Sequence, residues 1–351
     1  MMQIIWNLII WVLLGSWCVL NHLSIFIQKI KCTLFCIDTM LTISSNFQYI
    51  GPKTQEKKAP APLLFEDHSR LESVSRTGTF EVSDTILPVP SVSDLLADEL
   101  GVSNLVHKLN KYGMVVLAPQ TVPRPDDLLK FNMLFGGIVR HQRSRPNGLV
   151  LIDPSDPNSV NVAATEKEHL LHTDEAYSDD ASSVVVLMCE VPSLSGGESV
   201  ILSGQRVIDR LAKVAPEEAF KGLFERDALC VGRTLPGMGS NAHCESTHPI
   251  LQQHEQPGRI RLRFRSKDSY IQRVNPSAAV GYDMLCTLTN DPENRLVLPL
   301  KAGHILILDN SAMAHGRLPY PQGMPRRLWR LNFDCKGVLP RGLSLGIHNS
   351  L

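Results

Sequence analysis

The sequence predicts a mainly β fold of the α+β class, arranged as a jelly roll or another barrel-like sandwich. Short segments of strand length recur through the second half of the chain. Helical spacing occurs mostly ahead of these segments or inserted between them, as in sandwiches and barrels with added helices. The 351 residues also include 23 Gly and 23 Pro, which indicates many turns.

The composition is that of a globular protein with balanced charge. Apolar residues make up 43% of the chain and charged residues 20%, which excludes a wholly disordered, collagen-like or coiled-coil protein. Lys and Arg together number 35, as do Asp and Glu, so the formal net charge is zero. Because nucleic-acid binding depends on excess positive charge, we expect no nucleic-acid partner. The length fits one large domain with additional segments.

Residues 1–40 form an apolar N-terminal segment, for which the sequence supports two interpretations equally. The run 4–27 is long enough to cross a bilayer as a helix, and Lys29 and Lys31 after it would place the rest of the chain on the cytoplasmic side. Alternatively, the start site is misassigned and the protein begins near Met40. We therefore expect a cytoplasmic protein, or a membrane-anchored one whose folded domain faces the cytoplasm.

A linker and one folded domain follow this segment. Residues 41–90 have no apolar period and contain Pro- and Lys-rich stretches, so we expect a disordered linker there. The domain is expected to span residues 91–345, beginning with a helix at Ser91. The further predicted elements are strands at 114–117, 184–188, 199–202, 259–265, 305–308 and 326–333, and helices at 126–136 and 205–226.

The predicted strand 259–265 alternates strictly between polar and apolar residues. Arg261, Arg263 and Arg265 therefore share one face of it. This face is interpreted either as a solvated surface or as a binding surface for an anionic substrate or carrier protein.

The chemistry of the chain is indicated by the sequence Leu171-His172-Thr173-Asp174. In an extended chain, residues two apart point to the same face, so His172 and Asp174 can reach one metal ion. His315 is the candidate for the third ligand. Two His and one carboxylate leave three open positions on an iron ion, as in non-haem Fe(II) oxygenases. A single HxD motif is common by chance, so the neighbouring motifs decide its meaning.

Several motifs occur in one order around this triad. They are HTD at 172–174, Gly196-Gly197-Glu198-Ser199, Leu308-Asp309-Asn310, His315-Gly316-Arg317 and Arg326-Arg327-Leu328-Trp329-Arg330. The stretch from Leu117 to Phe333 resembles the family of taurine dioxygenase and 2,4-dichlorophenoxyacetate dioxygenase, to which clavaminate-synthase-like enzymes are related. This resemblance implies a double-stranded β-helix (jelly-roll) core with flanking helices. It also implies an Fe(II)/2-oxoglutarate-dependent oxygenase that uses O2 and holds iron through His172, Asp174 and His315.

The resemblance also implies residues that bind 2-oxoglutarate. Ser199 lies 27 residues after His172, where the family has a Thr that binds this cosubstrate. Arg326 lies 11 residues after His315, where the family has an Arg for the distal carboxylate of 2-oxoglutarate. A guanidinium is a planar fork of donors that pairs with a carboxylate bidentately, which fits this role.

Arg330 completes the RxxxR pattern of the family. In a strand, Arg326 and Arg330 share one face and Arg327 lies on the other. A register error of one residue would exchange the roles of Arg326 and Arg327. Arg330 itself has two interpretations, which are a contact to an anionic group of the substrate and a second brace for 2-oxoglutarate.

Other residues are weaker candidates for substrate contacts. Glu168 lies where some relatives place a substrate contact, and would bind an ammonium group if it points inward; otherwise it is an exposed loop residue. Tyr177 either lines the pocket or is a core aromatic. His169 is expected to be structural or to face outward.

The resemblance implies the type of reaction, with release of succinate and CO2. Since Asp174 keeps the carboxylate that halogenating members lack, we expect hydroxylation of a C–H bond. The leading substrate is a small polar molecule such as an amino acid, free or tethered to a carrier. A sulfonate or aryloxy-acid oxygenase of the same family and a catalytically silent β-helix binding module are the alternatives. A zinc hydrolase using the same ligands is disfavoured. The sequence does not indicate which oligomeric state the protein has.

Overall fold

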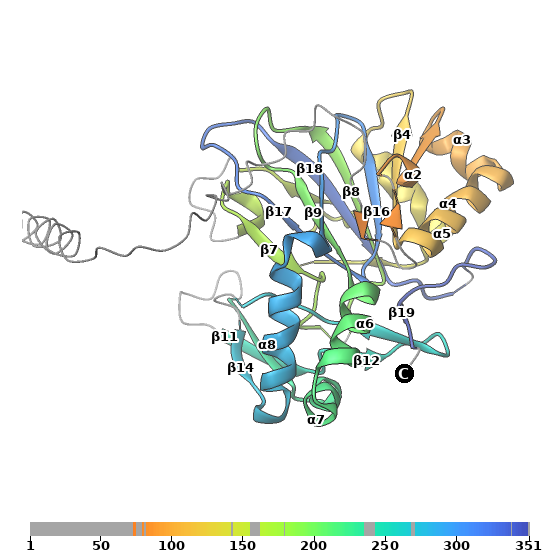
Figure 1. The fold of residues 1–351 in the computed structure, drawn as a ribbon. Coiled ribbons are helices and arrows are strands. Elements are labelled where there is room, and N and C mark those ends of the chain that lie inside the picture. Colours follow the sequence, from red (N-terminus) through yellow and green to blue (C-terminus); the bar gives the residue numbers. More distant parts are fainter. Residues whose placement is uncertain are drawn as a thin grey trace, which may run out of the picture. The chain divides into compact units, whose positions relative to one another are not determined.

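The structure is a computed structural model (Figure 1), and its described residues lie in one compact unit, Asp67–Leu351. It describes residues 73–74, 79–80, 82–141, 143–154, 162–178, 180–234, 243–267, 271–337 and 339–349. The predicted N-terminal segment 1–40, including the run 4–27, and most of the predicted linker 41–90 lie outside the described residues. Among the helices that are described, none combines the length and the apolarity needed to span a membrane.

Two antiparallel sheets form the centre of this unit. The larger sheet has the strand order β3-β4-β16-β8-β18-β5, with β6 also pairing with β18, and the smaller has the order β15-β9-β17-β7. The larger sheet contains β3 (Ile86–Val89), β4 (Met114–Pro119), β5 (Ile138–Val139), β6 (Val150–Ile152), β8 (Val184–Val191), β16 (Ile305–Asp309) and β18 (Arg327–Phe333). The smaller contains β7 (His169–His172), β9 (Ser199–Ser203), β15 (Arg295–Leu298) and β17 (Met313–Arg317). Only the β3–β4 pair is parallel among these described strands.

The chain winds alternately through the two sheets. It passes from β7 in the smaller sheet to β8 in the larger and back to β9, and it alternates again along β15, β16, β17 and β18. This winding is that of a double-stranded β-helix, so the predicted α+β jelly-roll fold is confirmed. The parallel strand β3 belongs to the sheet although it lies within the predicted linker 41–90. The larger sheet thus begins before residue 91. The division of the chain into an N-terminal segment, a linker and one folded domain stays a prediction.

Apolar side chains pack on both faces of the larger sheet, which explains its nearly continuous apolar strands. On β16, Ile305 and Ile307 face a core shared with helices, and Leu306 and Leu308 face the core between the two sheets. Strand β18 follows the same alternation. Its Trp329 belongs to the core on the helix side, whereas the residues that alternate with it along the strand point between the two sheets.

Helices cover the outer faces of the sheets (Figure 1). The helices α3 and α4 lie against the larger sheet, and α6 and α8 pack together on the side of the smaller sheet. The bounds of the helices are α2 (Val82–Thr85), α3 (Val92–Ala97), α4 (Glu99–Tyr112), α5 (Asn132–Phe135), α6 (Gly204–Val214), α7 (Glu217–Lys221) and α8 (Pro276–Asn290). The 3-10 helices are η1 (Pro125–Phe131), η2 (Val162–Ala164), η3 (Gly222–Phe224) and η4 (Pro292–Asn294).

The first predicted helix does begin after Ser91, but it is divided in two. The Ser91 hydroxyl accepts a hydrogen bond from the Asp94 N–H, which caps α3. Asp98 then ends α3 and caps α4, because its carboxylate accepts from the N–H groups of Leu100 and Gly101. Helix α4 ends at Gly113, whose left-handed φ of 74° suits glycine.

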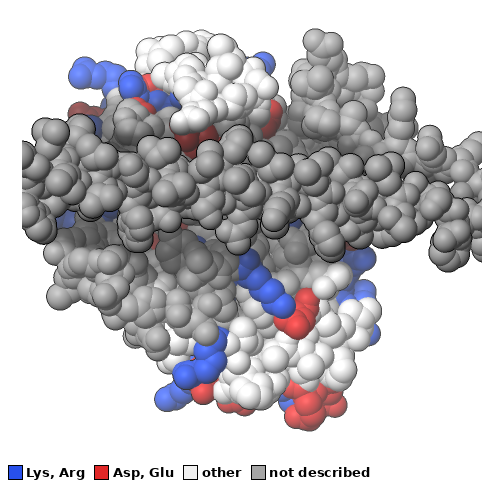
Figure 2. Space-filling view, turned by 90° about the vertical axis from the view of Figure 1, so that its left-hand side faces the viewer, with Lys and Arg blue, Asp and Glu red and all other residues white. Residues whose placement is uncertain are grey.

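Three smaller sheets complete the described chain. They are β1 (Ser73–Val74) with β2 (Thr79–Phe80); β10 (Leu229–Thr234) with β11 (His243–His248) and β14 (Ile271–Val274); and β12 (Leu251–Gln253) with β13 (Arg259–Leu262) and β19 (Ile347–His348). The predicted strand 259–265 is thus shortened to β13. On the face shown in Figure 2, Lys and Arg side chains lie among Asp and Glu side chains, as the balanced composition suggests.

We predict that Leu306→Ala lowers the free energy of unfolding by about 2–5 kcal/mol, because Leu306 is fully buried between the sheets and its truncation leaves a cavity. Urea denaturation followed by circular dichroism measures this change. The control is Leu100→Ala on α4, where the side chain is 68% exposed and we expect a change below about 0.5 kcal/mol. Equal effects of the two substitutions would contradict the assigned core.

Candidate metal centre and cosubstrate pocket

Strand pairing brings together the three predicted metal ligands, which are far apart in the sequence. His172 ends β7, and it lies directly opposite His315 of the neighbouring strand β17. Asp174 follows two residues after β7. One donor atom from each residue lies within 4.8 Å of the others, and all three side chains are buried. A single ion can therefore contact all three.

The histidine rings are oriented for metal binding. His172 Nδ1 lies 2.8 Å from the Leu170 carbonyl oxygen, which can only accept, so Nδ1 carries the proton. Nε2 of His172 then faces Asp174 Oδ1 at 3.5 Å, and Nε2 of His315 faces the same oxygen at 3.8 Å. Metal-binding histidines typically donate their second ring N–H to a carbonyl or carboxylate, as His172 does here.

The electrostatics favour the protonation states that a metal ion requires. Burial is the main cause that lowers the pKa of His315 to about 3, so its imidazole is neutral. Burial alone would raise the pKa of Asp174, but Arg330, together with His172 and His315, outweighs it and holds the pKa well below its usual value. Two imidazoles and one carboxylate form the donor set of a 2-His-1-carboxylate iron site, so these residues fit Fe(II).

Asn310, at the end of β16, fixes the backbone of Asp174. Its side-chain oxygen accepts from the Asp174 N–H at 2.8 Å, and its amide nitrogen donates to the Asp174 carbonyl at 3.1 Å. The same nitrogen donates to the Ser182 carbonyl at 2.8 Å. Asp174 lies in a turn outside the sheet ladder, so these bonds replace those that a strand neighbour would supply.

Two residues of β18 hold the Asp174 carboxylate. Asn332 donates to Oδ2 at 3.0 Å and to Glu175 Oε1 at 3.1 Å. Arg330 Nη1 lies 3.0 Å from Oδ1 and 2.9 Å from Oδ2. Glu175 is buried beside Asp174, and both its burial and that negative charge raise its pKa. The Asp174 carboxylate is thus oriented before any metal ion binds.

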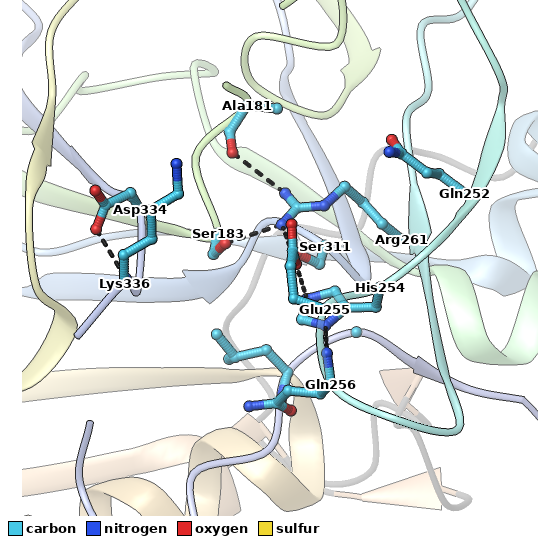
Figure 3. Close-up of polar contacts among 12 residues, drawn as sticks. Ala181, Ser183, Gln252, His254, Glu255, Gln256, Arg261, Ser311, Asp334 and Lys336 are labelled. Atoms are coloured by element: carbon cyan, nitrogen blue, oxygen red, sulfur yellow. Dashed lines mark hydrogen bonds and ion pairs between the residues drawn. The ribbon is translucent and has the colours of Figure 1, made fainter. Parts of the chain in front are cut away.

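The loop that follows Asp174 is fixed by two buried arginines, so the interpretation of a solvated arginine face on 259–265 is wrong. Arg261 is 6% exposed and Arg263 is 3% exposed. Arg261 donates to the Ala181 carbonyl and to the Ser183 hydroxyl (Figure 3). It also donates to the Ser182 carbonyl. Carbonyls of an irregular, partly buried loop need donors from outside it, and a guanidinium supplies several.

Arg263 binds the first part of the same loop. It donates to the Ala176 carbonyl at 3.2 Å and to the Ser178 carbonyl at 2.5 Å. Its third contact, to Gln252 Oε1 at 3.1 Å, ties the loop to β12. The arginines therefore position the chain around the metal ligand rather than offering a surface to an anionic partner.

The predicted cosubstrate residues Ser199 and Arg326 line one pocket. Ser199 begins β9, and Arg326 directly precedes β18. The pocket is lined by Cys189, Pro192, Ser193, Gly196, Gly197, Glu198, Ser199, Pro299, Leu300, Arg326 and Leu328. Because β9 pairs with β17, placing Ile201 opposite His315 and Ser199 opposite Arg317, this pocket lies along the strand that carries a metal ligand.

Arg326 remains charged inside this pocket. Burial and the charge of Arg317 lower its pKa to about 10, still well above neutrality. Its Nε donates to the Gly197 carbonyl at 3.0 Å, which leaves the terminal nitrogens of the fork for a carboxylate. Arg327 is exposed and pairs with Asp153 at 2.8 Å, so the structure has the register that places Arg326 inside and Arg327 outside.

The remaining predicted residues lie outside the metal site and the Arg326 pocket, or at the edge of the metal site. Glu168 is exposed, just before β7. Tyr177 is half-buried against the apolar core that includes Leu171 and Phe264. His169 does not face outward, because its ring centroid lies 4.1 Å from that of His172. It is therefore a packing neighbour of a metal ligand.

Sequence reasoning did not assign roles to Asn310, Asn332 and Glu175. Asn332 could have been found, because it is an amide within the apolar strand Arg327–Phe333, and a buried amide requires hydrogen-bond partners. Asn310 belongs to the motif Leu308-Asp309-Asn310, but the motif by itself assigns it no role. No periodicity relates it to Asp174, since the two lie 136 residues apart.

A 2-His-1-carboxylate site on a double-stranded β-helix defines the class of non-haem iron oxygenases. Comparison with known families gives a match over residues 75–332 to the taurine catabolism dioxygenase TauD, TfdA family. The chain belongs to this family. The predicted family resemblance is therefore confirmed.

Among curated proteins, the chain is 25% identical over 248 residues to human gamma-butyrobetaine dioxygenase, covering 69% of this chain and 62% of that protein. It is 27% identical over 200 residues to mouse mitochondrial trimethyllysine dioxygenase, covering 55% and 47%. It is also 25% identical over 162 residues to uridine-5'-phosphate dioxygenase of Amycolatopsis sp, covering 45% and 57%. The chain thus spans about half to three fifths of the length of these relatives.

Two solved structures have the same fold. One is asparagine oxygenase in complex with Fe(II), 2S,3S-3-hydroxyasparagine and succinate, with a TM-score of 0.51 and 15% identity over 71% of this chain and 93% of that one. The other is the non-heme iron oxygenase OrfP in complex with Fe and alpha-ketoglutaric acid, with a TM-score of 0.52 and 16% identity over 78% and 92%. At these identities the likeness shows the fold.

We predict that Asn310→Ala weakens Fe(II) binding about 10- to 100-fold, the usual effect of removing a group that orients a metal ligand. Without the amide, the Asp174 backbone loses the two bonds that fix it. Anaerobic calorimetric titration with Fe(II) measures the change. The control is the exposed Asn147, whose amide nitrogen donates to Asp126 and whose amide oxygen accepts from the Leu149 N–H. Neither contact involves a metal ligand, so Asn147→Ala should leave the affinity unchanged. Unaltered Fe(II) affinity in Asn310→Ala would show that the two hydrogen bonds between Asn310 and the Asp174 backbone are not needed for Fe(II) binding.

Proposed function

We propose that this protein is an Fe(II)- and 2-oxoglutarate-dependent dioxygenase that hydroxylates a C–H bond of a small polar substrate, with release of succinate and CO2. The observation that carries the proposal is the convergence of His172, Asp174 and His315 within 4.8 Å. Membership of the TauD, TfdA family supports it. When bound, the iron and 2-oxoglutarate together supply the oxidising chemistry with O2.

The residues of the chain have separate roles in this proposal. His172, Asp174 and His315 hold the iron, and Asn310 and Asn332 keep the carboxylate in place. The strands bury these donors, so water is largely excluded from the site. Exclusion of water strengthens every charge interaction at the site and protects the reaction from side products.

For 2-oxoglutarate we propose Arg326 and Ser199 as the binding residues. The buried guanidinium of Arg326 holds the distal carboxylate, and the Ser199 hydroxyl donates a further hydrogen bond to it. Their position in one pocket, along the strands that carry His315, supports this assignment. Arg330 points to the Asp174 carboxylate rather than into the pocket that Arg326 lines, which favours a substrate-side role over a second brace for 2-oxoglutarate.

The proposed substrate is an amino acid or a closely similar compound, free or tethered to a carrier. The names of the relatives support this class, since they act on gamma-butyrobetaine, trimethyllysine or asparagine. The Arg330 guanidinium also fits the sulfonate or aryloxy acid that the alternative within the family requires. Glu168 and Tyr177, proposed as substrate contacts from the sequence, have no contact in the described structure that adds support.

The location of the protein depends on residues outside the described structure. We propose that the enzyme is either cytoplasmic or anchored to a membrane by the run 4–27, with its folded domain facing the cytoplasm. Fractionation of cells that express the full chain and a chain starting at Met40 distinguishes the two, because only an anchored full-length chain sediments with membranes.

Replacement of the first ligand, His172→Ala, should abolish succinate formation because the iron loses one of its three protein ligands. Succinate release is measured with Fe(II), 2-oxoglutarate and a panel of amino acids and small acids. In the wild type, anaerobic Fe(II) and 2-oxoglutarate should give the weak visible absorption of their chelate. If that band and succinate are both absent from the wild type, the protein is a silent binding module and the proposal fails.

Replacement of the cosubstrate arginine, Arg326→Ala, should raise the KM for 2-oxoglutarate about 10- to 1000-fold, since a buried charge-assisted pair is lost. The adjacent exposed Arg327 is a matched control, and Arg327→Ala should change this KM by less than about threefold, because exposed ion pairs contribute little. Initial rates of succinate release over a range of 2-oxoglutarate concentrations give both values. A large effect confined to Arg327→Ala would reverse the assignment.

A further inference from the structure

The aromatic ring of Tyr320 lies beside two buried arginines. The guanidinium carbon of Arg317, at the end of β17, is 5.1 Å from the ring centroid, and that of Arg326 is 5.8 Å from it. All three residues are buried. The attraction between a cation and the negative face of an aromatic ring is strongest where water is excluded. The ring therefore contributes to the position of both guanidiniums.

Backbone groups of the segment before β7 fix this ring. The Tyr320 N–H donates to the Glu166 carbonyl at 3.1 Å, and the Tyr320 hydroxyl donates to the Thr165 carbonyl at 3.4 Å. Arg317 donates to the Ala163 carbonyl at 3.0 Å and to the Thr165 carbonyl at 2.7 Å. Tyr320 and Arg317 are thus fastened to the same short segment, and the ring has its place without any contribution from Arg326.

Two glycines let the Arg326 side chain lie against the same turn as this ring. The Gly197 carbonyl accepts from Arg326 Nε at 3.0 Å, and a Cβ atom on Gly197 would lie 3.1 Å from Arg326 Cδ. A Cβ atom on Gly196 would lie 2.5 Å from the Pro319 carbonyl oxygen and 3.3 Å from Tyr320 Cβ. Both glycines have a left-handed φ, of 69° and 74°. The turn therefore packs tightly on Arg326 and on the backbone that carries the ring.

The hydrogen bond at Nε does not by itself orient the end of the Arg326 side chain. A carboxylate that binds the fork needs both terminal nitrogens to face the pocket. An Arg side chain has many rotamers, and a ligand binds more tightly when the side chain is confined beforehand. The ring 5.8 Å from the guanidinium carbon favours the rotamers that stay beside it. Its negative face also offsets part of the repulsion between Arg326 and Arg317.

We propose that Tyr320 is a positioning residue for 2-oxoglutarate, because its ring holds the Arg326 guanidinium in the orientation that receives the distal carboxylate. This inference rests on the proposed function, in which Arg326 binds that carboxylate. Tyr320 is absent from the described residues that line the pocket, so it acts through the arginine rather than on the cosubstrate. The aromatic ring carries this role, and the hydroxyl group only helps to fix the ring.

The test measures the affinity for 2-oxoglutarate while the ring is removed or kept. Protein loaded anaerobically with Fe(II) is titrated with 2-oxoglutarate, and the visible absorption of the chelate gives the Kd. Tyr320→Leu should raise this Kd about 3- to 30-fold, the range expected for a desolvated contact between a cation and a ring. Tyr320→Phe, which keeps the ring, should stay within about twofold of the wild type.

A ring of nearly unchanged shape separates the electrostatic contact from packing. Pentafluorophenylalanine at position 320 has a shape close to that of Phe, but its ring carries the opposite charge distribution. It should therefore weaken 2-oxoglutarate binding relative to Tyr320→Phe. This comparison also decides the question if Tyr320→Leu does not fold, because neither of the two aromatic side chains leaves a cavity.

The matched control is Tyr112→Leu on α4. Tyr112 is 5% exposed, its ring centroid lies 4.8 Å from Lys111 Nζ, and it is absent from the described residues that line the pocket. This substitution removes a similar contact elsewhere and should leave the Kd for 2-oxoglutarate unchanged. In Tyr320→Leu, the KM for 2-oxoglutarate should rise while kcat changes by less than about twofold, because uniform binding is lost. The affinity for Fe(II) should stay at the wild-type value.

The outcomes separate this inference from the proposed function. Equal 2-oxoglutarate affinity in Tyr320→Leu and wild type, or equal affinity of the two proteins with Phe and pentafluorophenylalanine, would overturn the inference. A parallel loss of Fe(II) affinity would show a merely structural role and overturn it as well.

If the wild type forms no chelate, the proposed function fails, and a second titration then decides the inference. Glutarate carries two carboxylates without the keto group, so its binding to iron-free protein, measured by calorimetry, reports on Arg326 alone. Weaker glutarate binding by Tyr320→Leu than by the wild type supports the role of the ring. Equal binding, or none by the wild type, contradicts it.

Discussion

The pairing of β17 with β7 is the contact on which the site depends. It places His315 opposite His172, with both rings facing the space between the two sheets. Strand β17 is not held by this contact alone, because it also pairs with β9 along its full length. A shift of one residue in this register would turn His315 away from the interior, since successive side chains of a strand alternate faces. The fold thus fixes the metal site through backbone hydrogen bonds.

Asp174 lacks this support and is held by side chains instead. It lies beyond the end of β7, where the ladder no longer determines its direction. Asn310 fixes its backbone, and Asn332 and Arg330 fix its carboxylate. These groups come from the turn after β16 and from β18, so the larger sheet positions the acidic ligand and the smaller sheet positions the two histidines. The site is built where the two sheets meet.

Buried arginines have different tasks in this molecule. Arg261 and Arg263 donate to several loop carbonyls and serve the structure of the segment after Asp174. Arg326 makes one bond to a carbonyl and keeps the end of its fork for a ligand. Arg330 pairs with Asp174, and its buried Nε has no hydrogen-bond partner among the described residues. The number of donors that the protein itself satisfies distinguishes a structural arginine from one that binds a ligand.

The sequence by itself determined the features that depend on local periodicity and residue type. Alternation from Arg326 into β18 places Arg326 inward and Arg327 outward, the HTD motif contains two of the metal ligands, and Ser91 marks a helix start. The tertiary structure decided what depends on strands distant in the chain. The same alternation could not tell whether the arginines of 259–265 face solvent, because a polar face is buried when a loop with unpaired carbonyls packs on it. The convergence of Asn310, Asn332 and Arg330 on Asp174 likewise follows from strand pairing, and no spacing in the sequence encodes it.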